Sequence, residues 1–386
     1  MISYVVGAPG SFSVRFYLNE EGSALGDRMR IVQYDELVRL RHLPLGTWIF
    51  AEIDRLSGPE RDLVCIVCER LRAAKADVCV MNDPARVRLR HDLLCAAHNA
   101  GINHFQAWPA TSVQLRARAG AVNRDPDAVP ATTLRYPVFV RFANQHSGNL
   151  TPLLDSPADL ERAVASLAAG GIRLRELLVV EFCDTKDEHG VYRKYSAYKV
   201  GDRIIPRYLE CSRDWMVKWD QRIFDRERAE EETRYLETNP HEAWIRAIFR
   251  LARIDYGRID YGVLAGEPQV WEINMNPTIG RGPGPKLPQR ADIVAYKAIL
   301  APAFNAFYNN FQNAWEIVDR ATHTEGAVEL QTPRALVRAI DRAERQRRTA
   351  ERVGALVHVV ARQRWVRPMT RAVKRALAPV ALRFAR

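Results

Sequence analysis

The stretch RIDYGVLAGEPQVWEINMNPTIGRG, residues 258–282, decides the fold. Within it, two apolar segments, residues 260–264 and 268–274, flank the turn-forming sequence Ala265-Gly266-Glu267. Short apolar segments on either side of a glycine-containing turn are typical of a β-hairpin. We therefore predict two antiparallel strands in this part of the chain.

The pairing within this hairpin brings acidic side chains together. A hairpin centred on Gly266 places Asp260 opposite Glu272, with Asn274 two residues further along the same face. Two like charges directly opposed on a sheet are destabilising unless a cation lies between them, and two carboxylates with an amide oxygen are ligands that Mg2+ prefers. We therefore predict a Mg2+ site. The alternative left open is a solvated hairpin face on which Arg258 compensates the charge.

A second hairpin is predicted over residues 191–210, across Gly201-Asp202. This pairing places Lys194 and Arg207 on one face, and Lys218 follows the second strand. These cations are candidates for binding phosphate or substrate, and a solvated sheet edge is the alternative.

The charge of the chain is unevenly distributed. Its 386 residues carry a net charge of +11, yet residues 331–386 alone hold fourteen Arg, one Lys and three acids, so the remainder is close to neutral. Arginines spaced among apolar residues in this extension predict a helix. Three alternatives are open for what this helix contacts: a membrane surface, an acidic polymer, or the body of the protein itself. Nucleic acid is disfavoured because no zinc-finger or helix-turn-helix pattern is present.

Composition excludes several classes of protein. With 47% hydrophobic and 27% charged residues, and without an apolar run of about 18 residues, the chain falls in the soluble globular class. The first residues lack the pattern of a signal peptide, and six cysteines are too few for a disulfide scaffold. The expected location is the cytoplasm, with the inner face of a membrane as the alternative for the basic extension. The oligomeric state is left open.

Strands and helices alternate over the first hundred residues, which predicts a parallel sheet. The expected fold class is α/β and α+β, with an α/β domain followed by further α+β parts. The predicted domains are residues 1–110, 111–185, 186–315 and a basic helical extension over 316–386.

Five pieces of the sequence together resemble the ATP-grasp superfamily, which includes RimK-like enzymes, glutathione synthetase and D-alanine–D-alanine ligase. MNDPARVRLRHDLLCAAHNAGI (residues 81–102) resembles its asparagine-proline loop and helix. YPVFVRFANQHSGNLTPLLDSPADLERAV (136–164) resembles its nucleotide-binding strand, loop and helix, and LLVVEFCD (177–184) its adenine hinge. R-x-D followed by E-x-N (258–274) resembles its Mg2+ site. The resemblance spans roughly residues 75–285.

This resemblance implies an ATP-grasp fold with an N-terminal pre-grasp domain and two halves that clamp ATP with Mg2+ (or Mn2+). It also implies a ligase that activates a small-molecule or peptide carboxylate as an acylphosphate, which an amine or similar nucleophile then attacks. An acceptor other than an amine, giving a phosphorylated metabolite, is an alternative within this class. A non-catalytic ATP-binding adaptor, held at a membrane or acidic polymer by its basic extension, is the alternative from another class.

The resemblance also implies roles for particular residues of this chain, as nucleotide contacts, catalytic residues and metal ligands. Two departures from the family pattern concern the nucleotide: Arg141 stands where Lys is usual, and the loop 143–148 has a single glycine. Arg88 is an alternative to Arg90, and Asn276 follows the metal strand. The expected nucleotide contacts are Arg90, Arg141, His146, Glu181, Cys183 and Lys194; the expected catalytic residues are Arg207, Lys218 and Arg281; and the expected metal ligands are Asp260, Glu272 and Asn274.

Overall fold

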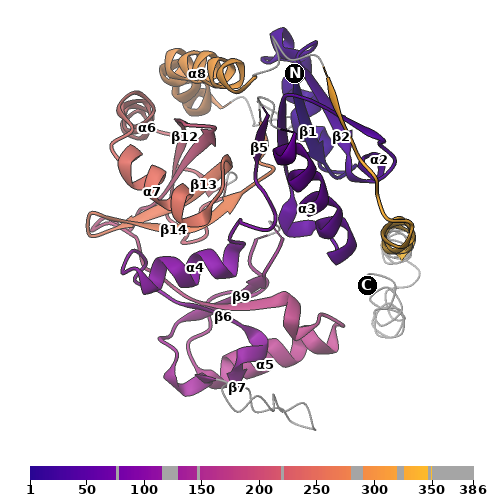
Figure 1. Ribbon diagram of the computed structural model, residues 1–386. Helices are drawn as coiled ribbons and strands as arrows, with labels where there is room; N and C mark the ends of the chain where they lie inside the picture. The colour runs from indigo at the N-terminus through magenta and orange to yellow at the C-terminus, as the bar shows by residue number, and fades with distance from the viewer. Residues whose placement is uncertain are drawn as a thin grey trace, which may run out of the picture. The chain divides into compact units, whose positions relative to one another are not determined.

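In the computed structural model the chain forms two compact units (Figure 1). The structure describes residues 1–74, 78–114, 129–145, 148–218, 221–279, 290–319, 326–346 and 349. The larger unit comprises Met1–Leu56, Arg61–His104 and Cys183–Gln331, and the smaller one comprises Ser57–Glu60, Phe105–Phe182 and Thr332–Arg386.

The larger unit begins with a four-stranded parallel sheet, which confirms the prediction of a parallel sheet. Its strand order is β2-β1-β4-β5, so β1 lies inside the sheet and is buried along its whole length. The helices α1 and α3 connect these strands. The bounds are β1 Ile2–Val6, α1 Ser11–Asn19, β2 Met29–Gln33, β4 Thr47–Phe50, α3 Gly58–Ala73 and β5 Cys79–Met81.

The second sheet of this unit is antiparallel and has the strand order β12-β11-β13-β14. Both predicted hairpins are present in it, because β11 pairs with β12 and β13 pairs with β14. The bounds are β11 Tyr192–Val200, β12 Arg203–Ser212, β13 Tyr256–Leu264 and β14 Glu267–Asn274.

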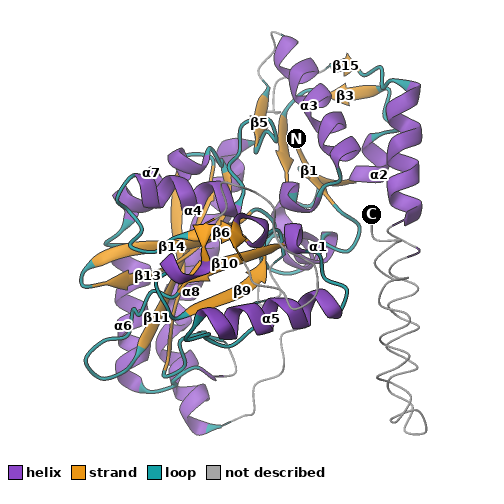
Figure 2. Ribbon diagram, turned by 90° about the horizontal axis from the view of Figure 1, so that it is seen from below, coloured by secondary structure: helices purple, strands orange, loops and turns teal. Residues whose placement is uncertain are grey.

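Helices cover both faces of the antiparallel sheet (Figure 2). On one face, Tyr198 and Tyr256 pack with Phe311 and Trp315 of the long helix α8 (Ala291–Val318). On the other face, Tyr195 and Tyr261 contact rings of α6 (Arg226–Thr238) and α7 (Glu242–Ala252). Helix α4 (Arg90–Asn99) lies beside β14.

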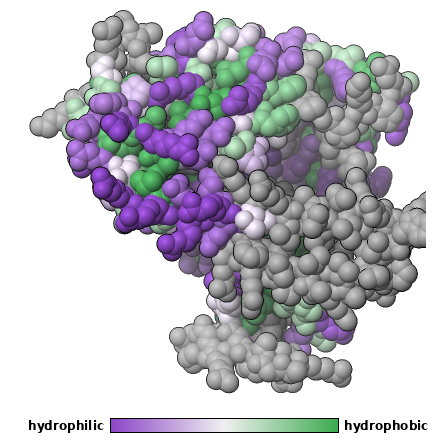
Figure 3. Space-filling view, turned by 90° about the vertical axis from the view of Figure 1, so that its right-hand side faces the viewer, coloured by the Kyte–Doolittle hydropathy of each residue, from purple (hydrophilic) through white to green (hydrophobic). Residues whose placement is uncertain are grey.

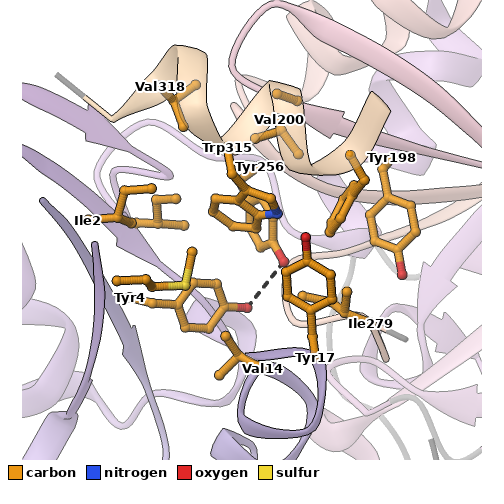
Figure 4. Close-up of a cluster of buried hydrophobic side chains, with 14 of the residues drawn as sticks. Ile2, Tyr4, Val14, Tyr17, Tyr198, Val200, Tyr256, Ile279, Trp315 and Val318 are labelled. Atoms are coloured by element: carbon orange, nitrogen blue, oxygen red, sulfur yellow. Dashed lines mark hydrogen bonds between the residues drawn. The ribbon is translucent and has the colours of Figure 1, made fainter. Parts of the chain in front are cut away.

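One aromatic-rich core connects the two sheets of the larger unit, as the close-up in Figure 4 shows. Tyr4 of β1 meets Tyr256 of β13 edge to face at 5.6 Å between ring centroids, and Trp315 lies against both. Buried aromatic pairs of this geometry add stability beyond the area that they bury. The position of β13, which carries Asp260, therefore depends on contacts with the parallel sheet.

The smaller unit contains a three-stranded antiparallel sheet in the order β6-β10-β9. Helix α5 (Pro157–Ala169) begins at its N-cap Ser156, whose hydroxyl accepts the backbone N–H of Asp159. Leu160 and Val164 of α5 pack with buried valines of the sheet. The strand bounds are β6 Ala107–Pro109, β7 Val113–Gln114, β8 Val129–Pro130, β9 Val138–Phe142 and β10 Leu177–Glu181, with β7 and β8 forming a separate parallel pair.

Shorter elements of the described chain include α2 (Tyr34–Leu37), β3 (His42–Pro44) and β15 (Ala327–Glu329), with β3 and β15 paired, and residues 334–346 are helical. Figure 3 shows hydrophilic side chains surrounding smaller apolar groups on one face. Across the parts of the chain that the structure describes, no helix is both long and apolar enough to pass through a membrane. The basic segment beyond residue 349 lies outside the described residues, so the prediction of helix there stays a prediction.

Candidate active site

The hairpin of β13 and β14 places Asp260 opposite Glu272, as predicted. The turn is Ala265-Gly266, both at positive φ, with Leu264 paired to Glu267. A regular ladder from this turn would place Asp260 opposite Trp271. A β-bulge next to Asp260 leaves Trp271 as the extra residue on β14 and brings Glu272 into register instead.

The two acids belong to a row of polar residues that crosses all four strands. Ser196 of β11 pairs with Tyr208 of β12 on one side and with Asp260 on the other, and Asp260 pairs with Glu272. Residues paired in this way across neighbouring strands present their side chains on one face. The row therefore gathers two hydroxyl groups and two carboxylates on one face of the sheet.

Asp260 is buried and firmly oriented. Its Oδ1 accepts hydrogen bonds from Arg258 Nε at 2.9 Å and Ser196 Oγ at 2.7 Å, and its Oδ2 accepts one from Arg258 Nη2 at 3.1 Å. Only 9% of the Asp260 side chain is exposed. Arg258 thus compensates the charge, as the alternative reading expects, but the face is not a solvated one.

Glu272 is paired with the first residue of α4. Arg90 Nη2 donates to Glu272 Oε2 at 2.7 Å, and the Arg90 side chain is almost completely buried. Arg88, the alternative to Arg90, donates instead to the carbonyl of Leu251 near the end of α7. Arg90 is therefore the basic residue of this segment that reaches the hairpin of β13 and β14.

The strand end that carries Asn274 is tied to the parallel sheet. Asn274 Oδ1 accepts the backbone N–H of Asn276 at 2.9 Å. The Asn276 side chain in turn accepts the Tyr4 hydroxyl at 2.9 Å and donates to the carbonyl of Gly10 at 3.1 Å. These bonds hold the end of β14, where Asn274 lies two residues after Glu272, against the loop after β1.

The donor set suits a hard cation. An ionised carboxylate offers about four lone-pair sites, and Asp260 uses three of them in the bonds above, which leaves Oδ2 able to accept once more. Asn274 Oδ1 likewise has room for a second partner. Within the described ranges, no group of three or more His, Cys, Asp or Glu side chains could hold a metal ion. A cation here would therefore need water or phosphate oxygens to complete its coordination, as Mg2+ commonly has.

Lys194 lies on the same face and is deeply held. Its ammonium is 2.5 Å from Glu210 Oε2, donates to the carbonyl of Val217 at 3.2 Å, and lies 5.5 Å from the Tyr208 ring centroid. Burial alone lowers the pKa of Lys194, but Tyr208, Glu210 and Asp260 outweigh it and raise the pKa above its ordinary value. Lys194 is therefore charged at neutral pH.

A buried ionic network continues from Lys194 into the helices. Glu210 lies 3.6 Å from Arg222, whose other nitrogen is 2.8 Å from Glu232 of α6. Glu232 is fully buried and also accepts the Tyr296 hydroxyl of α8 at 2.6 Å. Burial raises the pKa of Glu232, although Arg222 and Tyr296 oppose that effect. This network fixes β11, β12, α6 and α8 around the site.

The remaining predicted catalytic residues have different surroundings. Arg207 of β12 lies over aromatic rings of α8, whereas Lys218, in the loop after β12, is exposed. The structure thus brings Arg207 and Lys194 to one face of the sheet with the two acids. Arg281 and His146 lie outside the described residues.

The predicted hinge residues are found in the smaller unit and at its chain boundary. Glu181 of β10 is buried, and its carboxylate accepts the Arg135 guanidinium at 2.8 Å and the backbone N–H of Gln106 at 3.0 Å. Arg141 of β9 pairs with Leu178 in the sheet, and Cys183 directly follows this unit. The Glu181 side chain is thus engaged by its own chain, so the backbone of this segment is what remains for a nucleotide edge.

Two buried asparagines support the hairpin of β13 and β14: Asn82, which lies in the segment that resembles the asparagine-proline loop, and Asn103, which the sequence did not single out. Asn103 donates to the carbonyl of Val270 and accepts its N–H, both at 2.9 Å, so its amide pairs with edge strand β14 as another strand would. Asn82 donates to the carbonyl of Tyr256 and accepts backbone N–H groups at the start of β13. An asparagine directly after a buried strand, as at Asn82, was the available signal.

The fold and site define a mixed α/β protein, as predicted, with an acidic and amide face on an antiparallel sheet. No protein-family model and no curated protein sequence matches the chain. Its structure is similar to that of D-alanine–D-alanine ligase from Bacillus anthracis complexed with ATP, at 14% identity over 81% of this chain and 98% of that one, with a TM-score of 0.41. It is also similar to the ATP-grasp ligase PsnB complexed with a phosphomimetic variant of its minimal precursor, Mg and ADP, at 13% identity, 78% and 97% coverage and a TM-score of 0.40.

A third similar structure is L-amino acid ligase from Bacillus licheniformis, at 13% identity with a TM-score of 0.35. The similarity covers 71% of this chain and 66% of that ligase. The identities and TM-scores of these three similarities are low, so the proposal below rests on the residues of this chain.

Proposed function

We propose that this protein is an ATP- and Mg2+-dependent ligase of the ATP-grasp class, which activates a carboxylate for attack by an amine. The observation that carries the proposal is the register of β13 and β14. It places Asp260, Glu272 and Asn274 on one face, with an arginine holding each carboxylate in position. Oriented hard-oxygen donors of this kind are suited to hold Mg2+ against nucleotide phosphates.

The proposed reaction has two steps. An oxygen of the substrate carboxylate attacks the γ-phosphorus of ATP, which forms an acylphosphate and releases ADP. The amine nitrogen then attacks the acyl carbon, the carbon–phosphate oxygen bond breaks, inorganic phosphate leaves, and the nitrogen loses a proton. Mg2+, when bound, supplies positive charge beside the phosphates, where negative charge moves during phosphoryl transfer.

The residues of this chain have distinct parts in this scheme. Arg258 and Arg90 hold the two acids in place, and their charge lets two carboxylates stand opposite each other. Lys194 stays protonated and provides a cation for an anionic group. The further assignments rest on the family resemblance: Arg141, His146, Glu181 and Cys183 for the nucleotide, and Arg207, Lys218 and Arg281 for catalysis.

Titration calorimetry with the non-hydrolysable ATP analogue AMP-PNP tests the metal site. We expect Asp260→Asn and Glu272→Gln each to weaken Mg2+-dependent binding at least tenfold, because each removes an anionic ligand. Glu267→Gln on the same hairpin is the matched control, since its side chain is exposed. Equal binding by all four proteins would contradict the proposal, and the same titration with Mn2+ shows which ion the site prefers.

The product distinguishes the amine ligase from its alternatives. ADP and phosphate release are measured with a panel of carboxylates, with and without amines. Release of ADP that requires both a carboxylate and an amine is the expected result. ADP release with a phosphorylated product and without any amine would identify the acceptor as another nucleophile, and nucleotide binding without turnover across the panel would favour the adaptor.

A further inference from the structure

Arg207 occupies an irregular place in the antiparallel sheet. In β12, Tyr208 pairs with Ser196 and Pro206 pairs with Ala197, so Arg207 between them faces no residue of β11. A residue left out of the ladder at a bulge is free to aim its side chain in a way that regular pairing would not allow. Bulges of this kind are frequent next to active sites.

The guanidinium of Arg207 is clamped by aromatic rings. Its carbon lies 4.6 Å from the ring centroid of Phe307, 5.2 Å from Phe304 and 5.7 Å from Tyr308, all on α8. Stacking on ring faces holds a guanidinium electrostatically without neutralising it. The rings therefore fix the orientation of the group while leaving its charge and its N–H donors for another partner.

Arg207 lacks the counter-charge that its neighbours have. Lys194 is paired with Glu210, and Arg258 is paired with Asp260. In the part of the chain that the structure describes, Arg207 forms neither an ion pair nor a hydrogen bond, and its Nη1 is buried without a hydrogen-bond partner. A buried donor of a charged group without an acceptor is costly, which points to an anion that completes the site when bound.

The position of Arg207 relates this charge to the proposed chemistry. Its neighbour Tyr208 is the β12 member of the row that continues through Ser196 to Asp260. The backbones of β12 and β13 are two strand spacings apart, or roughly 10 Å. Arg207 thus directly precedes the β12 member of this row, on the next strand but one from Asp260.

We propose that Arg207 binds a second anionic group of the substrate, a carboxylate that is distinct from the one being activated. This inference rests on the proposed function. The planar guanidinium presents paired N–H donors in a fork that matches a carboxylate, so a substrate with two carboxylates would be bound through one and react through the other. The substrate class is therefore a dicarboxylate, or an amino acid or peptide that carries an additional carboxylate.

Differential scanning fluorimetry with simple anions tests this site in the full-length protein saturated with Mg2+ and AMP-PNP. The probes are glutarate, which has two carboxylates, and valerate, which has the same number of carbons and one. We expect glutarate at millimolar concentration to raise the melting temperature by at least 2 °C more than valerate does. Arg207→Gln should abolish this difference and Arg207→Lys should retain part of it, because Lys keeps the charge without the fork.

Arg203→Gln is the matched control, because Arg203 is an exposed arginine on the same strand. It should respond to glutarate as the unaltered protein does. Absence of any glutarate effect in the unaltered protein, or an undiminished effect in Arg207→Gln, would overturn the proposal. Two further results would overturn the proposal. One is loss of AMP-PNP binding in Arg207→Gln, and the other is a stabilisation by inorganic phosphate that depends on Arg207 and disappears when AMP-PNP is bound. Both would place Arg207 at the nucleotide phosphates.

The two proposals fail in distinguishable ways. If Mg2+-dependent AMP-PNP binding is present and only the glutarate effect is absent, the proposed function stands and the second carboxylate does not. If the nucleotide does not bind at all, the proposed function itself fails, whatever the response to glutarate.

Discussion

Glu52, at the end of β4, is a buried carboxylate in a left-handed backbone conformation, with φ of 54°. Its oxygens accept the backbone N–H of Gly7 at 3.1 Å and the guanidinium of Arg55 at 2.7 Å. The carboxylate lies so close to Gly10 that a Cβ there would be 2.2 Å from Glu52 Oε2. Glu52 thus determines the path of the loop between β1 and α1. The carbonyl of Gly10, in this loop, accepts a hydrogen bond from the Asn276 side chain.

Gly10→Ala should therefore lower the free energy of unfolding by about 1–3 kcal/mol, because a buried side chain must move to admit the methyl group. Urea denaturation at neutral pH measures this change. Gly58→Ala is the control, since a Cβ at Gly58 meets nothing within 4 Å. The double variant Gly10→Ala/Glu52→Ala should show the two substitutions to be non-additive, and simple additivity would contradict the proposed clash.

His241 gives the protein a pH dependence of known sign. Its ring packs against Tyr195 and Tyr261, its Nδ1 is 2.9 Å from the Tyr261 hydroxyl, and burial lowers its pKa below 6.5. Well above pH 6.5 the residue is neutral in both the folded and the unfolded state, so it adds no pH dependence there. As the pH falls below 6.5, the unfolded chain binds the proton more readily, so the free energy of unfolding decreases.

The loss of stability between pH 7.5 and pH 5.5 should thus be smaller in His241→Gln than in the unaltered protein. Urea denaturation at both pH values provides the comparison. His189→Gln, at a mostly exposed side chain, should leave the loss unchanged. An equal loss in all three proteins would show that His241 does not titrate differently on folding.

At the scale of elements, β14 is an edge strand whose outer edge is hydrogen-bonded by the side chain of Asn103. The Asn103 amide forms both hydrogen bonds of a strand partner with Val270, two residues before Glu272. Gln269, buried beside it, accepts the backbone N–H of His104 at 2.7 Å. These bonds cover an edge that would otherwise expose unpaired backbone groups, and they hold the strand that carries two candidate metal ligands.

Asn103→Ala should destabilise the protein by about 2–4 kcal/mol, because it leaves a buried N–H and a buried carbonyl of Val270 without partners. Chemical denaturation measures the cost. Asn99→Ala, at an exposed position of α4, should change stability by less than about 0.5 kcal/mol. We also expect Asn103→Ala to weaken Mg2+-dependent AMP-PNP binding, since Glu272 follows on the same strand. A variant as stable as the control would show that water replaces the amide.

At the scale of the whole molecule, contacts between residues close together in the sequence were predictable, whereas contacts between distant residues were not. The pairing of Asp260 with Glu272 was accessible because only twelve residues separate them, although a β-bulge, which the sequence did not predict, sets their register. The contact of Arg90 with Glu272 spans 182 positions and was not predicted, because the resemblance implied a nucleotide contact for Arg90. The aromatic clamp of Arg207 and the approach of Glu52 to Gly10 depend on how separate elements pack, which local periodicity does not encode.

The basic extension is a second feature of the whole chain, and its role is separable from that of the site. Removal of residues 351–386 should leave AMP-PNP affinity within about twofold, because the candidate ligands all lie before residue 331. Titration calorimetry measures the affinity, and sedimentation with vesicles containing anionic phospholipid measures attachment to a membrane. We expect the shortened protein to lose vesicle binding, since each basic residue near an anionic surface adds about 1 kcal/mol of attraction. Vesicle binding unchanged by truncation would show that residues 351–386 do not attach the protein to a membrane.

The buried network of Lys194, Glu210, Arg222 and Glu232 has a consequence for how this sequence can diverge. Replacing one member leaves a charge buried without its partner, which costs about 3–5 kcal/mol, whereas replacing a complete pair with apolar residues can be nearly neutral. A single substitution would exhaust much of the stability of an ordinary domain. Evolution at these four positions should therefore be compensatory, so that related sequences keep both pairs or exchange the members of a pair together.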